Sequence, residues 1–138
     1  MRRPIRTVMI VGLFLAGMWL MVGCQESLPE RCQREAREYT KKKCPVPINE
    51  VVTLDSLTFD SGTLTIHYHY TVKGHADSEE VIERSKEQLA SSLLAGLRNS
   101  TEMKVYMDAH YRFAYTYHSA THPETVLWEA VYTDKDYQ

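Results

Sequence analysis

Residues 63–72 read TLTIHYHYTV, an alternation of polar and apolar side chains. A period of two places successive side chains on opposite faces of a β-strand. The apolar face would carry Leu64, Ile66, Tyr68, Tyr70 and Val72, and the polar face Thr63, Thr65, His67, His69 and Thr71. This stretch therefore predicts a strand with one side in a core and the other in water, which is typical of a half-buried sheet.

The neighbouring residues extend this strand into a hairpin. Asp60-Ser61-Gly62 has the composition of a tight turn, and residues 51–59 before it predict a second strand. A second hairpin is predicted from residues 110–117 and 125–133, with a turn around His122-Pro123. Aromatic and apolar side chains again share one face, namely Tyr111, Phe113, Tyr115 and Tyr117 on the first strand and Val126, Trp128, Ala130 and Tyr132 on the second.

Two helices are predicted, one before each hairpin. Ser27 and Glu30 form a capping box for a helix that runs to about Lys43, where Pro45 stops it. Asp77 with Glu80 is predicted to cap the second helix, which runs to about Arg98. Its predicted buried stripe is Ile82, Leu89, Leu93 and Leu97. Residues 101–108 fit either a helical turn or a short strand.

These elements predict an α+β domain in the order helix, hairpin, helix, hairpin. We expect a four-stranded antiparallel sheet with two main helices packed on one face, because so aromatic a sheet face must be covered. If the helices stand away from the sheet, Tyr68, Tyr70, Tyr111 and Tyr115 would line a groove.

The first 23 residues have the parts of a secretory signal peptide: a basic start, an apolar run over residues 8–22 and a small residue before the cut. Residues 20–24, LMVGC, resemble the lipobox of bacterial lipoproteins. That resemblance implies cleavage before Cys24 and acylation of Cys24. Gln25 after it favours the outer over the inner membrane. Two alternatives stay open, a membrane-spanning anchor, for which the apolar run is shorter than about 20 residues, and plain secretion.

Removal of the signal leaves residues 24–138 as a single domain. Three of the 16 basic residues leave with it, so 13 basic residues remain against 18 acidic ones, a net charge of −5. This balance argues against a nucleic-acid partner, which requires a basic surface.

Several short stretches resemble an uncharacterised family of small lipoproteins of Gram-negative bacteria. They are CPVPIN (44–49), LDSL (54–57), NSTEMK (99–104), FAYTY (113–117) and the ending at residues 136–137. The resemblance implies the fold and an envelope location, and it implies no activity.

Cys32 and Cys44 fall at opposite ends of the first predicted helix. Twelve helical residues span roughly 18 Å, whereas a disulfide needs Cα atoms within about 7 Å. An oxidising envelope favours a bridge, so a free buried Cys32 and a Cys32–Cys44 disulfide both remain open, the second requiring a shorter helix.

The histidines are the main candidates for chemistry. His67 and His69 leave the same face of a strand, a spacing used by metal sites. If the alternation of the second hairpin holds, His110, Arg112 and His118 could face that same side of the sheet. The candidate partner face is therefore His67, His69, His110 and Arg112. The sequence places no carboxylate suitably on this face, and it lacks a nucleophile motif and a phosphate-binding loop, so we expect no cofactor and no catalysis.

The sequence thus predicts a non-catalytic, membrane-anchored envelope lipoprotein that acts as a binding or structural module. Its expected partners are the membrane, through the lipid anchor, and an envelope protein. The alternative is a metal-binding or hydrolytic protein centred on His67 and His69. A third hypothesis, a small-ligand carrier, requires a pocket.

Overall fold

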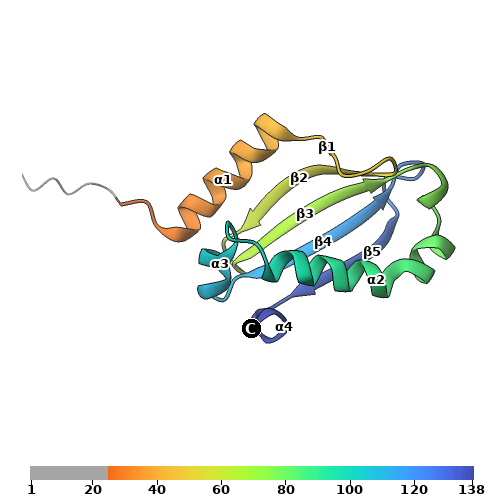
Figure 1. The fold of residues 1–138 in the computed structure, drawn as a ribbon. Coiled ribbons are helices and arrows are strands. Elements are labelled where there is room, and N and C mark those ends of the chain that lie inside the picture. Colours follow the sequence, from red (N-terminus) through yellow and green to blue (C-terminus); the bar gives the residue numbers. More distant parts are fainter. Residues whose placement is uncertain (1–24) are drawn as a thin grey trace, which may run out of the picture.

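The computed structural model describes residues 25–138. The predicted signal peptide and Cys24 lie outside the described residues. Within the described part, the chain forms a five-stranded sheet with the two long helices on one side of it (Figure 1). In chain order the elements are α1 (Leu28–Lys43), β1 (Val46–Pro47), β2 (Val52–Asp60), β3 (Thr65–Val72), the 3₁₀ turn η1 (Gly74–Ala76), α2 (Glu79–Arg98), α3 (Lys104–Asp108), β4 (Arg112–Ser119), β5 (Val126–Tyr132) and α4 (Asp134–Tyr137).

The sheet is mixed, so the prediction of four antiparallel strands with two main helices was wrong. Its order is β1-β2-β3-β4-β5, and β3 pairs with β4 in parallel while the other pairs are antiparallel. The reason is α2, whose 20 residues extend about 30 Å. This length returns the chain to the end of the sheet where β3 began, so β4 must run in the same direction as β3. The broad α+β class is compatible with this architecture.

Three short elements account for the remaining differences. β1 adds a fifth strand of two residues, paired with Thr53 and Leu54. Because it consists of Val46 and Pro47 and directly follows Pro45, its sequence has no strand-like alternation. The one-turn helices α3 and α4 raise the number of α-helices in the described part to four.

Helix α1 has the predicted capping box, since the Ser27 and Glu30 side chains each accept a hydrogen bond from the other residue's backbone. Cys32 and Ala36 are buried beneath it. Both Cys32 and Cys44 are free thiols. Desolvation by burial raises the pKa of the Cys32 thiol to about 12, which keeps it protonated and unreactive.

The core lies between the sheet and the two long helices, which cover the same side of it (Figure 1). Its most completely buried large side chains are Ile66, Val72, Tyr111 and Phe113. The strand faces agree with the predicted alternation except at Val126, which was predicted on the apolar face but is 44% exposed. A bulge in the pairing of β4 with β5 places it opposite His118 instead. β3 begins at Thr65 because Leu64 has a positive φ of 53° in the preceding turn. Between residues 25 and 138 there is no helix with the length and apolarity needed to span a membrane.

Candidate functional site

Helix α2 is buried most deeply near its two ends and less deeply in its middle. Ile82 near the start and Leu97 near the end are buried, with 8% and 4% of their surface exposed. Leu89 and Leu93 between them are only half-buried. The predicted stripe is therefore only partly covered, and a space opens between α2, α1 and the sheet.

Three tyrosines line the floor of this space, Tyr68 and Tyr70 on β3 and Tyr115 on β4. Together with Tyr117, which lies beside Tyr70 on β4, we call them the tyrosine grid. Parallel pairing sets Tyr68 beside Tyr115 and Tyr70 beside Tyr117. The rings of each pair stack, with centroids 4.8 Å and 4.5 Å apart and planes within 10° of parallel. Along β3 the centroids of Tyr68 and Tyr70 are 6.5 Å apart.

The hydroxyls of the tyrosine grid make no hydrogen bond within residues 25–138, although Tyr70, Tyr115 and Tyr117 are each more than nine-tenths buried. The nearby Tyr132 hydroxyl, by contrast, donates to the Ala90 carbonyl at 3.0 Å. Among the described tyrosines, only Tyr111 has an unpaired hydroxyl that is sealed from solvent. The grid hydroxyls therefore open into the space above them.

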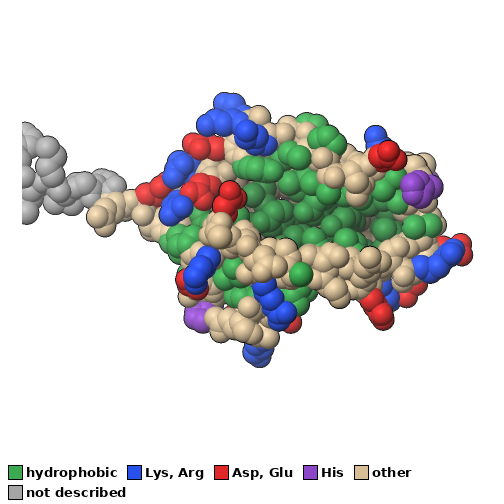
Figure 2. Space-filling view, viewed as in Figure 1, with side chains coloured by type: hydrophobic (Ala, Val, Ile, Leu, Met, Phe, Trp, Pro, Cys, Tyr) green, Lys and Arg blue, Asp and Glu red, His purple; other side chains and the backbone are tan. Residues whose placement is uncertain are grey.

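Two adjoining hollows make up this space, which we call the α1–α2 groove. One, of about 240 Å³, is lined by Tyr68, Tyr70, Tyr115, Ser92, Leu93, Gly96, Leu97, Ser100 and Met103. The other, of about 320 Å³, shares Met103 and is lined further by Arg31, Glu35, Tyr39, Leu57 and Glu102. Figure 2 shows the apolar surface that this groove exposes between α1 and α2.

The electrostatics of the groove favour neutral donors. Burial raises the pKa of Tyr70 to about 12 and raises the pKa values of Tyr68, Tyr115 and Tyr117 as well. These phenols therefore stay protonated at neutral pH and can donate hydrogen bonds. At one end, Glu35 is paired with Arg31 at 2.6 Å, whereas the exposed Glu102 has no salt-bridge partner in the described part of the chain.

The opposite, polar side of the sheet carries His67 and His69. Their rings stack with centroids 3.9 Å apart. Hydrogen bonds join His67 Nε2 to Thr116 Oγ1 at 2.6 Å and His69 Nε2 to Thr58 Oγ1 at 3.0 Å. Desolvation lowers the pKa of both rings, that of His69 to about 4, so both are neutral at pH 7.

The structure assembles only part of the candidate partner face. Arg112 lies on it, beside Thr65 at the start of β4. His118, opposite Thr71, joins the same face with a buried Nδ1 that has no partner in residues 25–138. His110 is separate, because a positive φ of 60° turns it toward α4, where it pairs with Asp134 at 3.1 Å. No cluster of three metal-binding side chains is found among the described residues.

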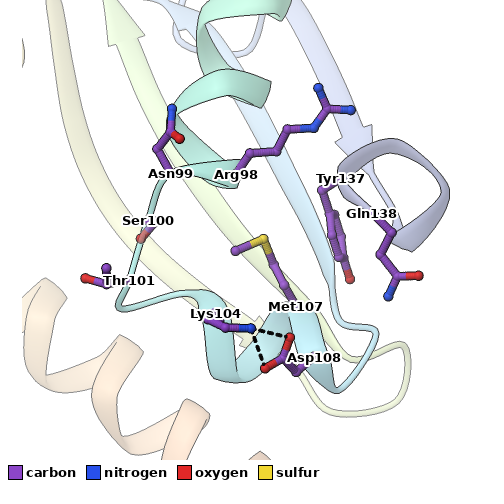
Figure 3. Close-up of a pocket in the computed structure, with 9 residues that line it drawn as sticks. All are labelled: Arg98, Asn99, Ser100, Thr101, Lys104, Met107, Asp108, Tyr137 and Gln138. Carbon is purple, nitrogen blue, oxygen red and sulfur yellow. Dashed lines mark hydrogen bonds and ion pairs between the residues drawn. The ribbon is translucent and has the colours of Figure 1, made fainter.

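A further hollow of about 380 Å³ lies where the end of α2 meets α3 and α4 (Figure 3). Its charged side chains already have partners. Lys104 binds both carboxylate oxygens of Asp108, at 3.0 and 2.9 Å, and Arg98 donates to the Asp136 carbonyl. This hollow therefore offers a ligand fewer free polar groups than the α1–α2 groove.

Comparison with known proteins gives one family. Residues 27–128 match the model of a domain of unknown function, DUF8479. The chain belongs to this family. The match includes every residue that lines the α1–α2 groove, so the groove lies within the DUF8479 domain itself. No curated protein matches the sequence.

A solved structure shares the fold of this DUF8479 domain. It is that of a "putative secreted protein" from Pseudomonas aeruginosa, with a TM-score of 0.65 and 13% sequence identity. The alignment covers 81% of this chain and 98% of the Pseudomonas chain. At this identity the likeness establishes the fold alone.

The sequence pointed to part of the groove. Of the four tyrosines expected there, Tyr68, Tyr70 and Tyr115 line it. Tyr111 instead packs at the closed end of the core against Phe59 and Tyr106, and Tyr117 completes the grid. The walls from α2 were not foreseen, because periodicity shows which face of a helix turns inward but not how far it stands from the sheet.

Proposed function

We propose that this DUF8479 protein is a lipid-anchored, non-catalytic binding module of the bacterial cell envelope, and that it binds its ligand in the α1–α2 groove. The observation that carries the proposal is the tyrosine grid. Its hydroxyls are unpaired within the described chain, although they lie beneath apolar walls. Because these hydroxyls are not sealed from solvent and stay protonated, they are free to donate hydrogen bonds to a ligand that supplies acceptors.

The proposed location in the cell envelope is based on the N-terminal sequence. The lipobox-like sequence ends at Cys24, and α1 begins at Leu28, so acylation of Cys24 would hold the domain close to a membrane. More than one acyl chain makes such attachment durable. The secreted description of the Pseudomonas protein with the same fold supports export, and Gln25 favours the outer membrane.

The lining of the groove supports binding rather than catalysis. Its protein groups are phenols, serines, aliphatic and thioether side chains, one arginine and two glutamates. General acid–base chemistry needs a group with a pKa near the working pH, and the phenols here are shifted away from neutrality. The groove therefore presents hydrogen-bond donors and apolar surface without an evident nucleophile–base pair.

The anchor is tested by mass spectrometry of the native protein. We expect the mature N-terminus to be an acylated Cys24, and we expect Cys24→Ala to leave the protein unprocessed or released from the membrane. A native protein that retains Met1, or a mature form without acyl chains, would contradict the anchor.

The groove is tested by photocrosslinking in cells. A photoreactive amino acid at Ser92, which lines the groove, should form an adduct that the same probe at the neighbouring Ser91 does not form. A Cβ at Gly96 would meet no atom within 4 Å, so Gly96→Trp can fill the groove while Gly96→Ala serves as its control. We expect the adduct at Ser92 to be lost with Gly96→Trp and retained with Gly96→Ala. Equal crosslinking at Ser91 and Ser92 would contradict the groove as the binding site. So would a Ser92 adduct whose yield is unchanged by Gly96→Trp.

A further inference from the structure

We infer that the ligand of the α1–α2 groove is an extended peptide, whose backbone carbonyls accept hydrogen bonds from the tyrosine grid and whose basic end lies beside Glu102. This inference rests on the proposed function and names the ligand class of the same site. Three features of the groove lead to it: the spacing of its donors, the character of its walls and the charge at one end.

The spacing of the donors matches an extended backbone. Tyr68 and Tyr70 are two residues apart on β3, and their ring centroids are separated by 6.5 Å. In an extended chain each residue advances about 3.3 Å, and alternate carbonyls point to the same side, so the carbonyls on one side repeat at about 6.6 Å. A peptide lying along β3 can therefore present successive same-side carbonyls to successive tyrosines.

The second row of the grid reinforces this match. Tyr115 and Tyr117 repeat the two-residue spacing on β4, and each stacks on its neighbour from β3. Because stacked rings stand side by side, the grid offers ring edges and hydroxyls rather than ring faces. Ring edges carry partial positive charge, so both the edges and the hydroxyls favour electron-rich atoms such as carbonyl oxygens.

The walls suit a backbone flanked by small or apolar side chains. The apolar surface is provided by Leu93 and Leu97 from α2 and by Met103 from the following loop. The small residues Ser92 and Gly96 allow a peptide chain to approach α2 closely. A bare acyl chain fits this site poorly, because it would cover the tyrosine hydroxyls without giving them an acceptor. A peptide supplies both acceptors and apolar side chains.

The charge at one end gives the peptide a direction. Glu102 is exposed and lacks a salt-bridge partner among residues 25–138, and it lines the hollow that shares Met103 with the hollow above the grid. Glu35 nearby is already paired with Arg31. The remaining negative charge favours a lysine, an arginine or a free amino terminus at this end and disfavours an acidic residue.

The experiment uses the full-length lipidated protein in nanodiscs of phosphatidylethanolamine and phosphatidylglycerol. Synthetic octapeptides randomised at every position are passed over it, and retained peptides are sequenced by mass spectrometry. We expect enrichment of peptides with a basic residue at one end and no acidic residue there, and we expect the best of them to bind with a measurable Kd by fluorescence anisotropy.

Two sets of variants connect that binding to the groove. Tyr70→Phe combined with Tyr115→Phe keeps both rings and should weaken binding at least fivefold, whereas the control Tyr137→Phe, whose hydroxyl donates to Tyr111 away from the groove, should not. Glu102→Gln should abolish the preference for a basic end. Glu79→Gln, a matched change at the distant start of α2, should keep it.

Each opposite result has a definite meaning. Peptide retention no greater than that of empty nanodiscs, or equal affinity in the double tyrosine variant, would overturn the peptide inference. If oleate or maltohexaose binds instead and loses affinity in the double variant, the ligand class is overturned while the groove remains the binding site. Absence of any Ser92-specific adduct in the crosslinking experiment is the separate result that contradicts the proposed function.

Discussion

Tyr111 and Tyr137 lie together at the closed end of the core, and their hydroxyls have different environments. The Tyr137 hydroxyl donates to the Tyr111 carbonyl at 2.7 Å, whereas the buried Tyr111 hydroxyl has no partner in the described residues. Removing a satisfied buried hydrogen bond costs about 1 kcal/mol, and removing an unsatisfied buried group relieves a penalty of about 1–3 kcal/mol.

We therefore expect opposite effects from the same substitution at these two positions. Tyr137→Phe should lower the free energy of unfolding by about 1 kcal/mol, and Tyr111→Phe should leave it unchanged or raise it by about 1 kcal/mol. Urea denaturation of the two variants measures both effects. Equal destabilisation of the two would show that the Tyr111 hydroxyl has an acceptor in solution.

His69 should make stability depend on pH. Burial, followed by the neighbouring His67 and His118, lowers its pKa from 6.5 to about 4, against an opposing effect of Asp55. Between these values the unfolded chain binds a proton that the folded chain resists, so the free energy of unfolding falls as pH drops from about 6.5 toward 4. His69→Gln should flatten this part of the urea-midpoint profile relative to wild type. Parallel profiles between pH 7.5 and 4 would contradict the shift.

At the residue scale, the sequence correctly predicted which side of the sheet a side chain faces wherever the alternation of a strand determines it. His67 and His69 lie on the polar side and Tyr68 and Tyr70 on the core side, because the pairing of β3 with β4 stays in register from Thr65 to Val72. His110 was assigned to the same side because it is two residues before Arg112, but this alternation holds only for residues inside a strand. Its positive φ and its contact with Asp134 place it in the turn before β4.

At the element scale, one threonine holds α1 to the sheet. Leu57 lies on β2 beyond the short β1, so its backbone groups at that edge have no strand beside them. Thr40 takes the place of a strand. Its hydroxyl donates to the Leu57 carbonyl and accepts from the Leu57 amide, both at 2.8 Å.

This contact predicts an effect larger than that of an ordinary surface change. Thr40→Val keeps the shape of the side chain but leaves a backbone donor and a backbone acceptor unpaired, so we expect a loss of about 1–3 kcal/mol in the free energy of unfolding. Thr40→Ser retains the hydroxyl and should lose less than half as much. Thermal or urea unfolding of the pair checks this, and equal losses would assign the effect to packing instead.

The two long helices were well predicted, because prolines and apolar stripes are local signals. The predicted cap of α2 was wrong: its N-cap is Ser78, without a side-chain hydrogen bond, and the Asp77 carboxylate accepts from Thr121 instead. The extra elements were not predicted. β1 is an edge strand of only two residues, Val46 and Pro47, and its one strand neighbour is β2. The separation of α2 from the sheet likewise depends on the bulk of the tyrosines beneath it, which no pattern within α2 contains.

At the scale of the whole molecule, the parallel pairing of β3 and β4 could not be predicted from local patterns. Two hairpins can join through an antiparallel or a parallel pair, and the choice depends on the direction in which the connecting helix carries the chain. The apolar alternation of β3 and β4 is the same in both arrangements. The sequence therefore predicted three of the grid tyrosines as groove residues, but not the side-by-side stacking that the parallel pairing gives them.

The same architecture predicts uneven local stability. β3 and β4 are central strands paired on both sides, whereas α2 leaves Leu89 and Leu93 half-buried. Amides of β3 and β4 should exchange hydrogen only on global unfolding, and those in the middle of α2 should exchange faster through opening of the helix. Hydrogen exchange followed by mass spectrometry measures this order. Equal protection of α2 and β3 would mean that α2 packs more closely than the structure shows.

The two edges of the sheet differ in a way that limits self-assembly. At one edge β1 is only two residues long and ends in Pro47, which has no amide hydrogen to offer another strand. At the other edge β5 is seven residues long, with Val126 and Val131 exposed. Within the described part of the chain, strand addition is therefore open on one side alone. A molecule with a single adhesive edge can close into a pair with a second copy, but it cannot continue into a fibre.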